Sequence, residues 1–74
     1  MKVELLTRQD CHLCDEALIA LRSLGVEPEL RDVDADPALH AIYDWRVPVV
    51  MLDGRVIAEG RIDLDMLRKA IQPA

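Results

Sequence analysis

The sequence lacks long apolar runs and clusters of basic residues. No stretch is apolar over the roughly 20 residues that a membrane-spanning helix needs, and the opening MKVELLTR, interrupted by Glu4, has no small-residue cleavage site. We therefore expect no secretion signal, no membrane partner and a cytoplasmic location. With a net charge of −5, the chain also lacks the clustered Lys and Arg residues that nucleic-acid phosphates require, so nucleic acid is not expected as a partner.

Internal repeats, linkers and low-complexity segments are also missing from the 74 residues. The composition, 51% hydrophobic and 31% charged, is typical of a folded domain and differs from that of a disordered chain. A domain of about 60 residues buries only roughly 60% of the surface that its unfolded chain exposes. The sequence therefore predicts a single domain over residues 1–74, acting as a monomer, with a thin core.

Only two cysteines are present, Cys11 and Cys14, in the stretch TRQDCHLCDEAL. A structural disulfide explains them poorly, because closing a four-residue loop stabilises a fold by only about 2 kcal/mol and because cytoplasmic thiols are kept reduced. A zinc site needs four ligands, whereas this stretch offers two thiolates and His12, so a thiolate site would require a second chain. An inert pair with one cysteine packed in the core is a further alternative.

A pair that exchanges electrons explains the spacing better. Residues three apart on a helix have Cβ atoms about 5–6 Å apart, close enough for a disulfide after a small adjustment. Cys14 belongs to the apolar face of the expected helix, whereas Cys11 lies at its start, where free backbone N–H groups favour a thiolate. We therefore predict that Cys11 attacks a substrate and that Cys14 resolves the product. His12 and Arg8 would lower the pKa of the Cys11 thiol, and nearby acids would raise it.

Apolar periodicity predicts four strands and three helices. The strands are expected at residues 3–6, 30–33, 47–52 and 55–59, and the last two are joined by Asp53-Gly54, a strong hairpin signal. The helices are expected from the cysteine stretch to Gly25, over 38–43 and over 64–71. The order β-α-β-(α)-β-β-α implies a parallel first pair of strands, an antiparallel last pair and helices that cover the sheet.

Polar residues and apolar spacing predict the ends and faces of the two later helices. Asp36 is expected to cap the short helix, with Pro37 at its first position, and Asp63 is expected to cap the last one. Leu39 and Ile42 should face the core from the short helix. The apolar face of the last helix is predicted to consist of Leu64, Leu67 and Ile71.

Over nearly its whole length the chain resembles the glutaredoxin-like branch of the thioredoxin fold. The matching features are the strand before CHLC, the acidic stretch RDVDAD, the stretch RVPVVMLDG and a glycine before the last helix. The resemblance implies a three-layer α/β fold, in which a four-stranded mixed sheet has helices on both faces. It also implies a thiol-disulfide oxidoreductase whose substrate is a disulfide in a protein or a small molecule. The electron donor would be a protein reductant or glutathione.

The resemblance further implies roles for residues outside CHLC. Pro48 would be a cis-proline beside the disulfide, and the backbone of Val47 would meet an incoming substrate strand. Arg8 stands where glutaredoxins carry a basic residue that binds a glutathione carboxylate. Gly60 and Arg61 stand within the stretch that corresponds to the second glutathione anchor, a Gly-Gly followed by a small residue and an aspartate.

Two stretches depart from the glutaredoxin pattern. CHLC has neither the proline nor the aromatic residue of the common glutaredoxin motif. In EGRID, Glu59 replaces a glycine and would repel a carboxylate, while Arg61 and the start of the helix could attract one. We therefore expect glutathione to be a poor co-substrate, and we expect no metal or other cofactor.

Several other residues are candidates for the site or for simple structural roles. Trp45, three residues before Pro48, is expected either to form one wall of a substrate groove or to pack in the fold. His40 is expected at the surface, and the aspartates of RDVDAD at strand ends and helix caps rather than in a cation site. The alternative to an oxidoreductase is a non-enzymatic thioredoxin-fold binding domain, with zinc or an iron–sulfur cluster shared between two chains.

Overall fold

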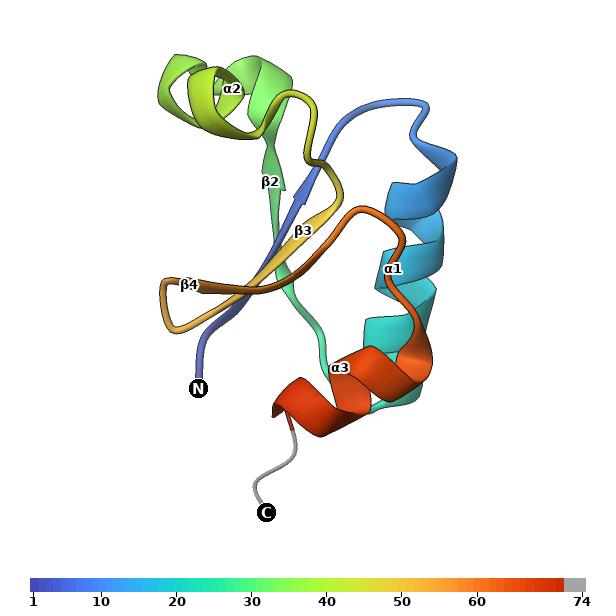
Figure 1. Cartoon of the computed structure of the whole chain (residues 1–74). Coiled ribbons are helices and arrows are strands. Elements are labelled where there is room, and N and C mark those ends of the chain that lie inside the picture. The colour runs from blue at the N-terminus through green and yellow to red at the C-terminus, as the bar shows by residue number, and fades with distance from the viewer. Residues whose placement is uncertain (72–74) are drawn as a thin grey trace.

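The computed structural model describes residues 1–71, so the last three residues of the domain predicted over 1–74 lie outside the described part. The elements follow the predicted order (Figure 1). The strands are β1 (Val3–Thr7), β2 (Glu29–Asp32), β3 (Val49–Leu52) and β4 (Arg55–Glu59). The helices are α1 (His12–Ser23), the short 3-10 helix η1 (Val33–Ala35), α2 (Pro37–Tyr43) and α3 (Leu64–Ile71). Within residues 1–71, no helix has both the length and the apolar character needed to cross a membrane.

The four strands form one mixed sheet in the order β2-β1-β3-β4. As predicted, β1 is parallel to β2, and β3 and β4 form an antiparallel hairpin. In the register, Thr7 pairs with Asp32, and Val49 pairs with both Leu6 and Glu59. The ends of β1, β2 and β4 and the start of β3 therefore lie at the same edge of the sheet.

We call this edge the cysteine edge, because the segment that follows β1 leads to the two cysteines. It gathers three segments that are far apart in the sequence: residues 8–14, 44–48 and 60–61. Figure 1 shows the three connections meeting at this end of the sheet, opposite the hairpin turn and the N-terminus. The fold thus brings most of the predicted site residues to one place.

Helices pack on both faces of the sheet, as predicted. In Figure 1, α1 and α3 lie together on one side, whereas α2 lies on the other side near the cysteine edge. The core between the sheet and α1 and α3 consists of Val3, Leu5, Ala17, Leu21, Val50, Ala58, Ile62 and Leu67. On the opposite face a smaller cluster contains Leu6, Val33 and Val49, packed by Leu39, Tyr43, Val47 and Met51.

The α2 face of the sheet also contains a buried charge. Glu4 is only 5% exposed, and its carboxylate accepts a hydrogen bond from Nη1 of Arg31 at 2.9 Å. Nη2 of Arg31 donates in turn to Asp36 at 3.3 Å. The hydrogen bond to Glu4 is the main reason why the pKa of Arg31 is raised. The residue that interrupts the apolar run at the N-terminus is therefore one member of an ion-pair chain between β1, β2 and α2.

Local signals in the sequence account for the element ends. Gly25, with φ 78°, follows α1, and the backbone N–H groups of Gly25 and Val26 donate to carbonyls of the last helical turn. Asp53 and Gly54 both have positive φ, as a type I′ hairpin turn requires. The carboxylate of Asp36 accepts the backbone N–H groups of Ala38 and Leu39 at the start of α2, and that of Asp63 accepts the backbone N–H of Met66 in the first turn of α3.

Three details of the prediction are wrong. Ile42 is 58% exposed, because α2 turns Leu39 and Tyr43 to the sheet instead. Leu64 is also exposed. The second strand ends before Val33, because the carboxylate of Asp32 accepts the backbone N–H of Asp34 and the chain turns into η1.

Candidate functional site

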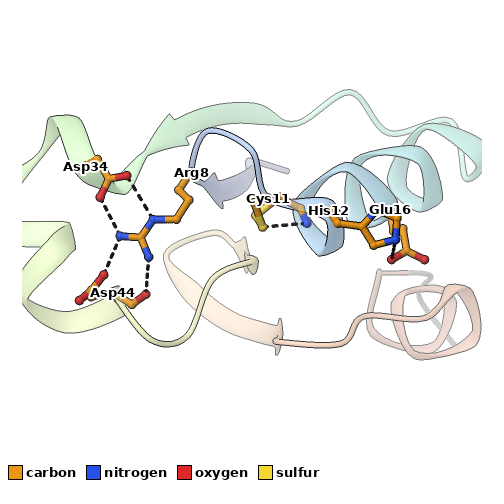
Figure 2. The surroundings of a disulfide bond; sticks show 7 residues. Arg8, Cys11, His12, Glu16, Asp34 and Asp44 are labelled. Carbon is orange, nitrogen blue, oxygen red and sulfur yellow. Dashed lines mark hydrogen bonds and ion pairs between the residues drawn. A yellow bond between two sulfur atoms is a disulfide. The ribbon is translucent and has the colours of Figure 1, made fainter.

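The two cysteines form a disulfide at the start of α1, with their Cα atoms 5.2 Å apart (Figure 2). Cys11 is the N-cap residue, as expected for a residue at the helix start, and its Sγ accepts a hydrogen bond from the backbone N–H of Cys14 at 3.1 Å. Cys11 is partly exposed, whereas Cys14 is buried and only 3% exposed. The two sulfurs therefore differ both in access to solvent and in hydrogen bonding.

Among residues 1–71, the hydrogen bond to a cysteine sulfur comes from the backbone and not from a side chain. His12 points into solvent, with 87% of its side chain exposed, and its Nε2 lies 3.2 Å from a carboxylate oxygen of Glu16. Asp10 and Asp15 flank the pair, are exposed and form no ion pair within residues 1–71. The favourable electrostatic contribution at Cys11 therefore comes from the backbone of the first helical turn, and a tuning role for His12 remains a prediction.

Arg8 binds two aspartates from other segments (Figure 2). Its Nε and Nη2 donate to the carboxylate of Asp34 at 3.1 and 2.7 Å, Nη2 also donates to the carboxylate of Asp44 at 2.6 Å, and Nη1 donates to the Asp44 carbonyl at 3.1 Å. The hydrogen bond to Asp34 is the main reason why the pKa of Arg8 is raised, and the same bond lowers the pKa of Asp34. Four of the five N–H groups of Arg8 are therefore engaged within the protein.

The aspartates of RDVDAD act as the sequence predicts, at turns and caps. Asp32 and Asp36 each accept backbone N–H groups, at the start of η1 and α2 respectively. Asp34, His40 and Asp44 could each offer one ligand atom to a cation, since these atoms lie within 4.8 Å of one another. Both carboxylates, however, already bind the guanidinium of Arg8. The guanidinium of Arg8 therefore already places a positive charge between these two carboxylates.

The segment before β3 is held to its neighbours on both sides. The Val47–Pro48 peptide bond is cis, and Pro48 is fully buried. The backbone N–H of Gly60 donates to the Pro48 carbonyl at 2.8 Å, which ties the β4–α3 connection to this segment. Arg46 donates through Nε to the carboxylate of Glu59, which raises the pKa of Arg46. The charge of Glu59 is therefore paired within the protein.

Two site residues predicted from the sequence are highly exposed. Trp45 is 95% exposed, so the alternative that it packs in the fold is wrong. Arg61 is also exposed and forms no ion pair with another described residue. Both lie in segments at the cysteine edge: Trp45 is three residues before Pro48, and Arg61 directly follows Gly60.

The fold brings Arg8, Cys11 and Cys14, the segment from Trp45 to Pro48, and Gly60 and Arg61 to the cysteine edge. The acids that bind Arg8 and Arg46 at this edge, Asp34, Asp44 and Glu59, were not predicted from the sequence. One signal could have indicated the first of them, because a parallel pairing of the first two strands places the residues after Thr7 near those after Asp32.

Comparisons with known proteins agree with this structure. The profile of the family described as Glutaredoxin-like domain (DUF836) matches residues 2–72. Among curated relatives, the uncharacterized protein Rv0508 of Mycobacterium tuberculosis is 40% identical over 79 residues, which cover 95% of this chain and 81% of the relative.

Two solved structures are also similar. Protein XcR50 from X. campestris has a TM-score of 0.78 at 36% identity, covering 90% of this chain and 91% of the other. The thioredoxin-like protein BC3987 has a TM-score of 0.75 at 31% identity, covering 95% of this chain and 100% of the other. The fold is thioredoxin-like, and a Cys-x-x-Cys pair at disulfide distance on this fold fits a redox role. The chain therefore belongs to the glutaredoxin-like domain family.

Proposed function

We propose that the protein is a thiol-disulfide oxidoreductase in which Cys11 attacks and Cys14 resolves. The observation that carries the proposal is the difference between the two sulfurs. Cys11 is partly exposed, caps α1 and accepts the N–H of Cys14, whereas Cys14 is buried in the apolar face of the helix. In the reduced protein the same N–H and the helix dipole stabilise a thiolate at Cys11 more than at Cys14.

The reaction proceeds by two exchanges. The Cys11 thiolate attacks a substrate disulfide, so that a bond forms between Cys11 Sγ and one substrate sulfur while the substrate S–S bond breaks. The released substrate thiolate takes up a proton. Cys14 then loses its proton, and its thiolate attacks Cys11 Sγ to form the Cys11–Cys14 disulfide and release the second substrate thiol. Two electrons have passed to the substrate, and a reductant must return them.

The segments around Pro48 and Gly60 would receive the substrate. The backbone of Val47 is assigned to an incoming strand, beside Pro48 and the Gly60–Arg61 turn. This assignment is supported by the shared sheet edge and by the hydrogen bond that holds Gly60 to Pro48. Arg61 is the exposed cation of this surface and would meet an anionic group of a substrate or donor.

A protein reductant suits this surface better than glutathione. Arg8, the expected partner of a glutathione carboxylate, uses four N–H groups on Asp34 and Asp44, and Arg46 binds Glu59. Arg61 remains as the one exposed anchor, and an exposed ion pair contributes only about 0–1 kcal/mol. We also propose that the protein is a monomer in the cytoplasm, where a reducing environment would return the cysteines to the dithiol state.

The decisive experiment is to trap the mixed disulfide with a Cys14→Ser variant. Incubation with a small disulfide should leave the adduct on Cys11, and wild-type protein should instead gain an internal disulfide, lighter by two hydrogens in mass spectrometry. Brief alkylation of reduced protein should label Cys11 before Cys14. Two thiols that stay free across a wide redox range would overturn the proposal, and faster labelling of Cys14 would reverse the roles. Visible absorbance with bound iron would instead favour a shared cluster.

The electron donor is tested by turnover of a small mixed disulfide with glutathione and its reductase, beside an ordinary glutaredoxin. We expect much slower turnover for this protein. Comparable rates that collapse in Arg8→Ala or Arg61→Ala would show that glutathione binds at this edge after all.

A further inference from the structure

The indole of Trp45 has no packing role in the described structure. Its exposure of 95% is the highest among the large hydrophobic residues of residues 1–71. A buried aromatic side chain removes about 150–250 Å² from water, so an exposed indole forgoes a large stabilisation. Tryptophan is also among the residues most enriched at the energetic centres of protein interfaces. Trp45 is therefore suited to contacts with another molecule.

The backbone on both sides of Trp45 is held by ion pairs. Asp44 binds Arg8 through its carboxylate and its carbonyl oxygen. Arg46 donates to Glu59, and its guanidinium lies over the ring of Tyr43, 4.9 Å from the centroid. A short segment fixed at both neighbours loses little backbone freedom on binding, and this lowers the cost of association. The indole is thus presented from a preorganised position.

The unpaired charges next to the two cysteines in the sequence are negative. Arg8 and Arg46 are paired with carboxylates, whereas Asp10 and Asp15, which flank the cysteines at the same edge, have no cationic partner among the described residues. A docking partner with basic residues beside its cysteine would meet these two carboxylates, and like charges would be repelled. Within residues 1–71, the cysteine edge therefore combines the exposed ring of Trp45 with unpaired negative charge beside Cys11 and Cys14, while the unpaired cation Arg61 lies in the β4–α3 connection.

We infer that Trp45 is a recognition residue for a polypeptide whose reactive cysteine is flanked by an apolar side chain and by basic residues. The apolar side chain packs on the indole, and the basic residues face Asp10 and Asp15. This inference rests on the proposed oxidoreductase function and specifies the class of substrate or reductant that the site accepts. It assigns Trp45 to binding, with no part in the exchange of sulfur bonds.

The test is the reduction of three disulfide-linked peptides that differ only beside the cysteine. One carries leucine and lysine, one leucine and glutamate, and one serine and lysine. We expect the kcat/KM of wild-type protein to be about tenfold higher for the first peptide than for either of the other two. A difference of this size is typical of one residue at the energetic centre of an interface. Trp45→Ala should lose the preference for leucine over serine, and Trp45→Phe should keep part of it. Ile19→Ala, which removes another exposed apolar side chain from α1, should behave as wild type.

Trp45 is the single tryptophan, so its fluorescence reports the contact directly. Binding of the first peptide to a Cys11→Ser, Cys14→Ser variant should shift the emission to shorter wavelengths. Equal rates for all three peptides in wild type and Trp45→Ala would overturn the inference while leaving the oxidoreductase proposal intact. If wild-type protein reduced neither the peptides nor a small disulfide, the oxidoreductase proposal itself would be overturned. A shift that depends on protein concentration without peptide would assign the indole to a second copy of the chain and overturn the inference.

Discussion

The two faces of the sheet are covered in chemically different ways. The face under α1 and α3 is packed by aliphatic side chains, among them the fully buried Leu21 and Leu67. On the other face α2 has no fully buried residue, and the sheet below it carries the buried carboxylate of Glu4. Apolar packing is strong but has little direction, whereas hydrogen-bonded ion pairs fix orientation. The first face therefore provides most of the stability, and the second positions α2.

Two arginines hold the two ends of α2. Arg31 on β2 binds Asp36, the N-cap residue, and Arg8 after β1 binds Asp44, the C-cap residue. A helix of seven residues is too short to be stable alone in water, so it depends on such tertiary contacts. Since the segment with Trp45 and Pro48 begins where α2 ends, the two ion pairs also determine where the candidate site lies.

The largest loss of stability is expected from Leu21→Ala on the α1 and α3 face. Leu21 is fully buried, and removal of its side chain should lower the free energy of unfolding by about 2–5 kcal/mol, as for other leucines in close-packed cores. Urea denaturation followed by circular dichroism would measure it. Ile19→Ala on the same helix is the matched control and should have little effect, because Ile19 is 67% exposed. If Leu21→Ala lost less free energy of unfolding than Glu4→Gln, a variant on the α2 face, the assignment of the two faces would be reversed.

An intermediate loss is expected from Glu4→Gln on the α2 face. The variant keeps the shape of the side chain but weakens the bond to Arg31, and a hydrogen bond to a charged group contributes about 1.5–3 kcal/mol. Thermal and urea denaturation would measure the decrease. Glu29→Gln removes a carboxylate of similar size from the neighbouring strand, where its side chain is 60% exposed, and should change little. Equal losses of stability for the two variants would show that the buried position of Glu4 does not increase its contribution to stability.

The smallest loss is expected from Arg8→Ala, and it should depend on pH. Arg8 lowers the pKa of Asp34 in the folded protein, so its contribution is present above the unfolded value of about 3.9 and is lost as the pH falls through the lower folded pKa. Unfolding of wild type and Arg8→Ala should therefore differ at pH 7 and converge in acid or high salt. Arg55→Ala, which removes an exposed arginine without an ion pair in the described chain, is the control. A difference that stays constant with pH would contradict a role through Asp34.

Local signals were sufficient to predict most of the fold. Asp36-Pro37, Asp53-Gly54 and Gly25 each favour one backbone geometry whatever surrounds them, and the structure has all three as expected. The error at Ile42 has a physical reason. In a helix of two turns, residues three and four after Leu39 satisfy the apolar spacing equally well, and the sequence does not say that Tyr43 turns inward while Ile42 stays in solvent.

The parts of the candidate site that depend on position along one helix were predicted from the sequence. The parts that depend on contacts between distant residues were not. Cys11 at the helix start follows from the Cys-x-x-Cys spacing and the strand before it. The pairing of Arg8 with Asp34 and Asp44 joins residues that are 26 and 36 positions apart, and charge alone does not select these partners among 14 acids. Burial of Glu4 was missed for the same reason, because Arg31 lies 27 residues further along the chain.

The hairpin turn at Asp53 lies at the end of the sheet opposite the cysteines, beside the N-terminal segment, where its carboxylate accepts the backbone N–H of Lys2. An affinity tag, a fluorophore or a fused carrier attached at this end is therefore kept away from Cys11 and Trp45. The same end offers the natural place to immobilise the protein on a solid support, so that the cysteines face the solution and column-bound protein can select thiol-exchanging partners without steric blockage.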